Sequence, residues 1–198
     1  MIKRRFFIRR LWVIYCLFTL AFINDAYALY LLYYQHRSNF LFYNIYQLAE
    51  TFLLYYYFYL IIKKTFVKRI IGFLSILYII LWLLSLLKFG NESYFSSCTN
   101  LENITILGLA IYYYYEQIII INSAFIYAEA SFWIVTAFFI YSAGTFFLFL
   151  YMPSLNLPEH GKYYVLTYIF TIIRTILLSV AIFIKPEFSK KINSNNFV

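Results

Sequence analysis

The chain has 198 residues, of which 64% are hydrophobic and 12% are charged, and its formal net charge is +8. Soluble domains contain roughly half apolar and a quarter charged residues, so this composition excludes an ordinary soluble domain. The apolar runs are continuous and do not alternate with polar positions. This pattern excludes a transmembrane β-barrel and predicts an all-α membrane protein of one domain, residues 1–198.

Six stretches are long and apolar enough to cross a bilayer as helices, which takes about 20 residues each. They are residues 11–33, 40–62, 70–87, 103–121, 131–151 and 163–184. The connections between them are short or moderate, and none has room for a soluble domain. The sequence therefore predicts a bundle of about six transmembrane helices.

The first of these stretches has a second interpretation. MIKRRFFIRR is followed by an apolar run and then by NDAYA, which is the layout of a cleavable signal peptide. Against cleavage, the apolar character resumes at once with LYLLYY and completes a full-length span. Cleavage after Ala28 would leave five spans and an external N-terminus, with the C-terminus still inside.

Basic residues predict the orientation, because Lys and Arg are retained on the cytoplasmic side of a membrane. With the N-terminus inside, twelve of the sixteen Lys and Arg residues lie on the cytoplasmic side and three lie outside. Both termini are therefore expected in the cytoplasm of a multi-pass inner-membrane protein. The cytoplasmic basic face comprises Lys3, Arg4, Arg5, Arg9, Arg10, Lys63, Lys64, Lys68 and Arg69, and Lys185, Lys190 and Lys191 follow the last span.

Four ionisable residues fall within the predicted spans, namely Asp25, Glu50, Glu116 and Arg174. A charge at bilayer depth costs about 2.5–3.5 kcal/mol and usually faces the interior of a bundle. A helical rise of about 1.5 Å per residue places Glu50 and Arg174 at nearly the same depth, and Glu116 about 6 Å closer to the cytoplasm. We therefore expect Arg174 to pair with Glu50, with Glu116 as its second choice.

The second span carries the most polar stripe. Asn44, Gln47 and Thr51 recur at three- and four-residue steps and so share one helix face, with Glu50 at its edge. Amides facing lipid would lack hydrogen-bond partners, so this face should point at other helices. The resulting polar core either fixes which helix packs against which or lines a path for an ion, proton or solute. The excess of acids over the one arginine favours a hydrated interior.

No pattern predicts catalysis. The sequence has no GxSxG, HExxH, GxGxxG or Walker motif, and its two cysteines have no metal-ligand spacing. We therefore expect no enzymatic activity, no metal and no cofactor. The small residues of the fifth span, Ser142, Ala143, Gly144 and Thr145, indicate close helix packing.

The size, the basic MIKRRFFIRR start, the run of hydrophobic spans and the Tyr/Phe/Ile-rich composition resemble the small membrane accessory protein of type VI-B CRISPR loci. The resemblance implies a non-enzymatic membrane protein that modulates RNA interference by an RNA-guided CRISPR RNA nuclease, with repression as the expected direction. Expected partners are the lipid bilayer, that nuclease and a second copy of the chain, without sequence-specific nucleic-acid binding. Two alternatives stay open: a small ion or solute channel or transporter, and a stand-alone membrane sensor module.

Overall fold

The computed structural model describes the backbone of residues 2–31, 34, 40–89, 96–120, 126–151 and 157–184. Within these ranges, the side chains of residues 2–11, 89, 96, 120 and 157–164 lie outside the description. The described part of the chain contains helices and no strand, so the predicted all-α fold is confirmed there.

The described residues form six α-helices, which follow one another in chain order. They are α1 (Ile2–Tyr30), α2 (Phe40–Ile61), α3 (Thr65–Phe89), α4 (Ser96–Ile120), α5 (Ala130–Tyr151) and α6 (Leu157–Phe183). A 3₁₀ turn, η2 (Ile126–Ala128), precedes α5. Each predicted span corresponds to one of these α-helices.

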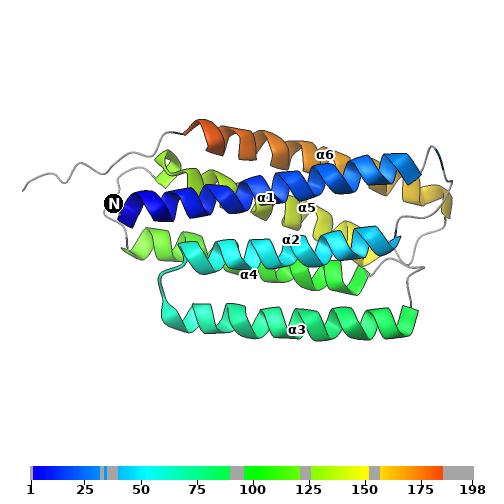
Figure 1. Cartoon of the computed structure of the whole chain (residues 1–198), viewed down its shortest axis with the longest axis horizontal. Coiled ribbons are helices and arrows are strands. Elements are labelled where there is room, and N and C mark those ends of the chain that lie inside the picture. The colour runs from blue at the N-terminus through cyan, green and yellow to red at the C-terminus, as the bar shows by residue number, and fades with distance from the viewer. Residues whose placement is uncertain are drawn as a thin grey trace, which may run out of the picture.

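The six helices lie side by side and alternate in direction (Figure 1). As a result, the start of α1, the connection between α2 and α3, and the C-terminal end of α6 lie at the same end of the bundle (Figure 1). Helix α5 packs mainly against α4 and α6, and α1 packs against α2. Helix α3 lies at one edge of the bundle, where it packs mainly on α2 and α4.

Four helical segments among the described residues are long and apolar enough to cross a membrane. They are Trp12–Tyr30, Thr65–Lys88, Ala130–Tyr151 and Val165–Phe183. Helices α2 and α4 have 22 and 25 residues, so at about 1.5 Å per residue each also exceeds the roughly 30 Å hydrocarbon core. Their polar and tyrosine residues, rather than their lengths, keep them out of this set.

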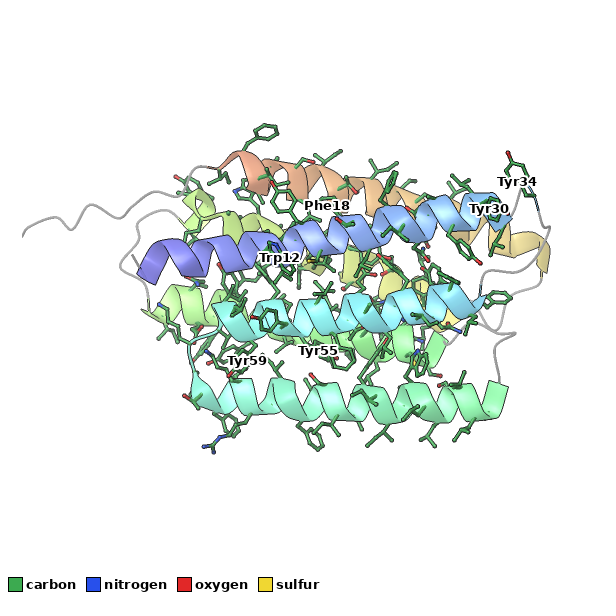
Figure 2. All side chains as sticks on the ribbon, viewed as in Figure 1. Trp12, Phe18, Tyr30, Tyr34, Tyr55 and Tyr59 are labelled. Carbon is green, nitrogen blue, oxygen red and sulfur yellow. The ribbon has the colours of Figure 1, made fainter. Side chains whose placement is uncertain are left out.

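Polar side chains gather inside the bundle, and large apolar side chains cover its outside. Buried polar residues include Asn44 and Gln47 on α2 and Glu102 and Asn103 on α4. Apolar side chains project outward along α3 and α6 (Figure 2). This distribution suits a lipid-facing bundle, because lipid offers no hydrogen bonds and the interior must supply them.

The small residues of α5 allow close packing, as predicted. A Cβ atom built on Gly144 would lie 2.3 Å from the nearest ring atom of Phe170 on α6. The aromatic ring therefore occupies the space that any larger residue at position 144 would need. Helices α5 and α6 make the most extensive helix–helix contact in the described bundle.

Candidate functional site

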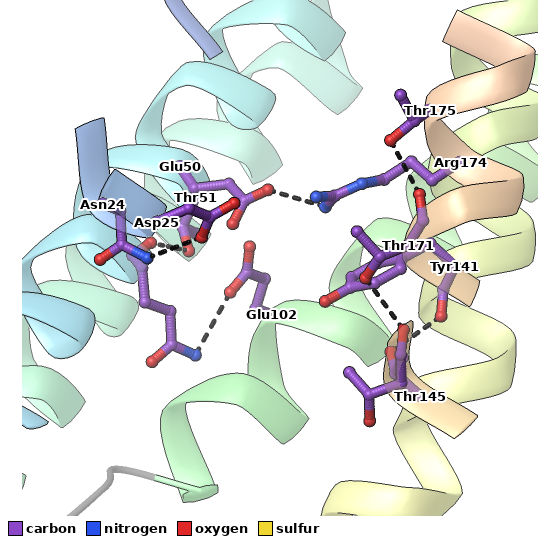
Figure 3. Close-up of polar contacts among 12 residues, drawn as sticks. Asn24, Asp25, Glu50, Thr51, Glu102, Tyr141, Thr145, Thr171, Arg174 and Thr175 are labelled. Carbon is purple, nitrogen blue, oxygen red and sulfur yellow. Dashed lines mark hydrogen bonds and ion pairs between the residues drawn. The ribbon is translucent and has the colours of Figure 1, made fainter. Parts of the chain in front are cut away.

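Arg174 and Glu50 form an ion pair between α6 and α2, as the depth argument predicted. The Nη1 atom of Arg174 donates to Oε1 of Glu50 at 2.9 Å (Figure 3). The two side chains are 12% and 13% exposed, respectively. The guanidinium also lies 4.2 Å from the centroid of the Tyr141 ring on α5, which adds a cation–π contact. Two other helices, α2 and α5, therefore stabilise the positive charge of Arg174 on α6.

The polar stripe of α2 faces the bundle interior, as expected from its spacing. Asn44, Gln47 and Thr51 are all buried. The Gln47 amide donates from Nε2 to Thr99 Oγ1, and it lies 3.4 Å from Oε2 of Glu102. The Thr51 hydroxyl donates to the backbone carbonyl of Gln47 at 2.8 Å. This face therefore joins α2 to α4 through side-chain hydrogen bonds.

Glu102 is a core residue that the sequence analysis missed. It lies on α4, is 6% exposed, and lies close to Glu50 (Figure 3). The predicted span began at residue 103, just past Glu102, because the residues before it are polar. The helix in fact begins at Ser96. The spacing of Thr99, Glu102, Asn103 and Ile106, all buried, continues one helix face and is the signal that would have revealed the earlier start.

Glu116 is buried, as predicted, and it does not contact Arg174, whose partner is the first choice, Glu50. Its carboxylate accepts hydrogen bonds from the backbone N–H groups of Lys63 and Lys64, at 3.0–3.1 Å. Because α4 runs to Ile120, Glu116 lies near the end of the helix, close to the connection between α2 and α3. A buried carboxylate at the start of α3 satisfies amides that the helix leaves unpaired.

Asp25 is exposed, which contradicts its prediction as a buried core residue. It accepts a long hydrogen bond of 3.5 Å from Nδ2 of Asn24, its neighbour on α1 (Figure 3). Its depth was estimated from the sequence, but depth does not say which face of α1 points at the bundle. Asp25 nevertheless lines the wall of a cavity beside the ion pair.

Two cavities flank the Glu50–Arg174 pair. The small cavity, of about 20 Å³, lies between α2, α4 and α5 and is lined by Gln47, Glu50, Glu102, Asn103 and Tyr141 among others. The large cavity, of about 200 Å³, lies between α1, α2, α5 and α6, with Asp25 and Arg174 in its wall. Glu50 and Tyr46 line both cavities. The pair therefore separates two hollow regions of the bundle.

The core carries more acids than its arginine can neutralise. Glu50 is paired with Arg174, and backbone amides stabilise Glu116. Among the described side chains, no cation lies within ion-pair distance of Glu102, whose hydrogen-bond donor Gln47 is neutral. Nowhere among the described residues do three or more His, Cys, Asp or Glu side chains form a group that could hold a metal ion. The site therefore has one carboxyl group without a cationic partner.

The described part of the basic face lies at the end of the bundle where α2 joins α3. The side chains of Lys63, Lys64 and Arg69 are exposed. Lys68 is half-buried, with Nζ 4.9 Å from the centroid of the Tyr59 ring. The remaining predicted members have side chains outside the described residues: Lys3, Arg4, Arg5, Arg9 and Arg10.

Comparisons of the chain with protein-family models, with curated proteins and with solved structures give no match. The resemblance to the accessory protein of type VI-B CRISPR loci therefore stays a prediction. The function has to be argued from the arrangement of the core and of the surface.

Proposed function

We propose that the chain is a six-span integral membrane protein with both termini in the cytoplasm. Four apolar helices support this topology, and α2 and α4 have the length to cross beside them. The alternation of the helices brings the N-terminal end of α1 and the C-terminal end of α6 to the side of the bundle where α2 joins α3 (Figure 1), and Lys63 and Lys64 lie in that connection. The retention of basic residues in the cytoplasm then gives the orientation.

Within this topology, the function that the geometry supports best is the movement of a small cation across the membrane by a channel or transporter. The observation that carries this proposal is Glu102, a buried carboxyl group beside the Glu50–Arg174 pair that has no cationic partner among the described residues. A buried charge without a counter-charge is costly, so locking helices together through the Glu50–Arg174 pair does not call for this additional acid. Ionisable groups at bilayer depth commonly mark ion or proton pathways, and the two cavities provide room along such a path.

Flux measurements test the proposal. The purified protein, reconstituted in liposomes, should pass H⁺, Na⁺ or K⁺ down an imposed gradient faster than protein-free liposomes do. Glu50→Gln and Glu102→Gln should both reduce this flux. Glu129→Gln is the matched control, because Glu129 is exposed between η2 and α5. Equal flux with and without protein, for all three cations, would reject the proposal.

A second candidate function is the modulation of an RNA-guided CRISPR nuclease, and the exposed basic side chains favour it. Lys63, Lys64 and Arg69 extend from the α2–α3 end of the bundle. A basic surface attracts anionic lipid, acidic proteins and RNA-bearing complexes within a Debye length of about 8 Å. This second function acts on another protein, whereas the movement of a cation needs no partner protein.

Co-expression tests this second candidate. Interference by a type VI-B nuclease should fall when the protein is present, and the fall should be smaller after Lys63, Lys64, Lys68 and Arg69 are replaced by Gln. Membrane fractionation of the variant controls for insertion. Interference that is unchanged by the wild-type protein would reject this function.

A further inference from the structure

The small cavity contains polar groups that lack partners. Gln47 Oε1 and Asn103 Nδ2 have no hydrogen-bond partner, and the two residues are 3% and 2% exposed. Both residues line the small cavity, beside Glu102. Leaving such groups unsatisfied costs free energy, so the free oxygen of Gln47 points to a positively charged or hydrogen-donating species within the cavity. The Asn103 Nδ2 group is itself a donor, so it lines the cavity without contacting a cation.

The volume and the donor atoms limit what this species is. A cavity needs about 10–15 Å³ to hold one water molecule, so about 20 Å³ admits one particle of that size and excludes a hydrated ion. Its wall offers the carboxylates of Glu50 and Glu102, the free oxygen of Gln47 and the hydroxyl of Thr99. An all-oxygen donor set suits hard cations.

Charge then distinguishes a cation from plain water. Arg174 pairs with Glu50, and no cation among the described side chains lies within ion-pair distance of Glu102, whose hydrogen-bond donor Gln47 is neutral. A buried charge without a counter-charge is strongly disfavoured, and one positive charge removes the imbalance whereas a divalent ion would reverse it.

We propose that Glu102 anchors a site for one monovalent cation in the small cavity, with the free Oε1 atom of Gln47 facing the same cation. The inference rests on the proposed transport function and identifies its cargo. Two sources supply the same charge: a proton bound to the Glu102 carboxyl group, or a desolvated alkali ion held by the surrounding oxygens. The first would show as a dependence on pH, and the second as a dependence on Na⁺ or K⁺.

Other titratable groups face Glu102 and take part in any pH response. They are Glu50, Tyr43 and Tyr55 on α2, Tyr78 on α3, Cys98 on α4, Tyr141 on α5 and Arg174 on α6. Since Glu50 is also a carboxylate, the contribution of Glu102 has to be isolated by substitution.

Thermal unfolding of the purified full-length protein in detergent tests the site. Ligand that binds only the folded state raises the Tm by mass action. The wild-type Tm should rise when choline chloride is exchanged for NaCl or KCl at constant ionic strength, or when the pH is lowered in choline chloride. Glu102→Gln should abolish the response, and Glu129→Gln should retain it.

A second variant guards against misfolding of Glu102→Gln. Gln47→Met keeps a similar shape but removes the amide, so it should weaken the same response without abolishing it. A wild-type Tm that is insensitive to Na⁺, K⁺ and pH would overturn the proposal, as would a Glu102→Gln variant that responds like wild type.

The unfolding and flux measurements separate the two levels of inference. Cation-dependent stabilisation without flux in liposomes would retain the site and reject transport. Flux that is as fast in Glu102→Gln as in wild type, without cation-dependent stabilisation, would retain transport and reject the site.

Discussion

Arg174 donates to Glu50 while its guanidinium lies over the ring of Tyr141, so two kinds of contact offset the cost of burying one charge. Neither contact comes from the neighbouring residues on α6. The hydroxyls of Thr171 and Thr175 donate to backbone carbonyls one turn earlier on the same helix. Arg174 therefore depends on α2 and α5 for its stability in the core.

Removing one partner of the Glu50–Arg174 pair should lower the free energy of unfolding more than removing both. Glu50→Gln leaves the guanidinium without its counter-charge, and at buried sites such a change costs about 3–5 kcal/mol of unfolding free energy. The double variant Glu50→Gln/Arg174→Gln should recover part of that loss. Denaturant titration in detergent measures the free energies.

The control for this cycle is Glu129→Gln combined with Arg174→Gln, since Glu129 is exposed and lies outside the core. That combination should give additive losses. Additive losses for Glu50 and Arg174 as well would mean that the two side chains do not interact in the folded protein.

Depth along the membrane was predictable for single residues, but their direction around a helix was not. Glu50 and Arg174 were matched by counting from span midpoints, and they meet. The same counting does not tell which face of α1 points into the bundle, and Asp25 on that helix is exposed. Counting residues also missed Glu102. The polar residues before it are typical of a loop, and the sequence does not show that they pack against α2.

At the level of helices, Glu116 ties α4 to the connection between α2 and α3. Its two carboxylate oxygens accept three hydrogen bonds from the amides of Lys63 and Lys64. Glu116→Gln replaces one acceptor by a donor and removes the charge, so we expect a loss of about 1–3 kcal/mol. Hydrogen exchange at the two lysine amides should become faster.

This effect should be local. Exchange in α5 should stay unchanged in Glu116→Gln, and Glu129→Gln should alter neither region. Unchanged exchange at Lys63 and Lys64 would show that the carboxylate does not hold this connection in place.

The contact between α5 and α6 makes a second prediction at this scale. Gly144→Ala places a methyl group where the Phe170 ring lies, and overpacking of this kind costs about 1–3 kcal/mol. Gly108→Ala is the matched control, because a Cβ atom at this helical glycine meets nothing within 4 Å. The control should be neutral or stabilising, since Ala favours helix by about 1 kcal/mol over Gly. Denaturant titration compares the two.

A compensating change sharpens this test. Phe170→Leu removes the ring and should restore part of the stability that Gly144→Ala loses. Equal effects of Gly144→Ala and Gly108→Ala would contradict the close approach of α5 and α6.

The helix ends were predictable where apolar residues give way to polar ones that face no other helix. The ends of α2 and α5 lie within one residue of the predicted spans, at Phe40, Ile61, Ala130 and Tyr151. The start of α4 was seven residues off, because its first turns are polar and yet buried against α2 and α3. Hydropathy measures affinity for lipid and does not register a neighbouring helix.

For the whole molecule, the alternating helices make a complete topology prediction. Reporter fusions after Arg37, Lys64, Glu92, Ser123 and Ser154 should alternate out, in, out, in, out, and a C-terminal fusion should report the cytoplasm. The physical reason is that this proposed orientation puts twelve of the sixteen basic residues on the cytoplasmic side, where Lys and Arg are retained. An alkaline phosphatase and fluorescent-protein pair at each position provides the measurement.

An N-terminal epitope tag is the matching control for the first span. The tag should remain on the full-length protein and be protected from externally added protease. Its loss would support signal-peptide cleavage instead, and a periplasmic C-terminus would contradict the proposed orientation.

The burial of polar faces on α2 and α4 has a consequence for biogenesis. These two helices, unlike their neighbours in sequence, fall short of the hydropathy that marks a membrane-crossing segment. Each follows, in the chain, a segment apolar enough to cross a membrane: Trp12–Tyr30 of α1 and Thr65–Lys88 of α3, respectively. During synthesis, α1 with α2 and α3 with α4 would therefore leave the translocon as helical hairpins, in which the second helix has the lower affinity for lipid. Their retention in the bilayer would depend on pairing with each other, which couples insertion of the first half of the protein to its folding.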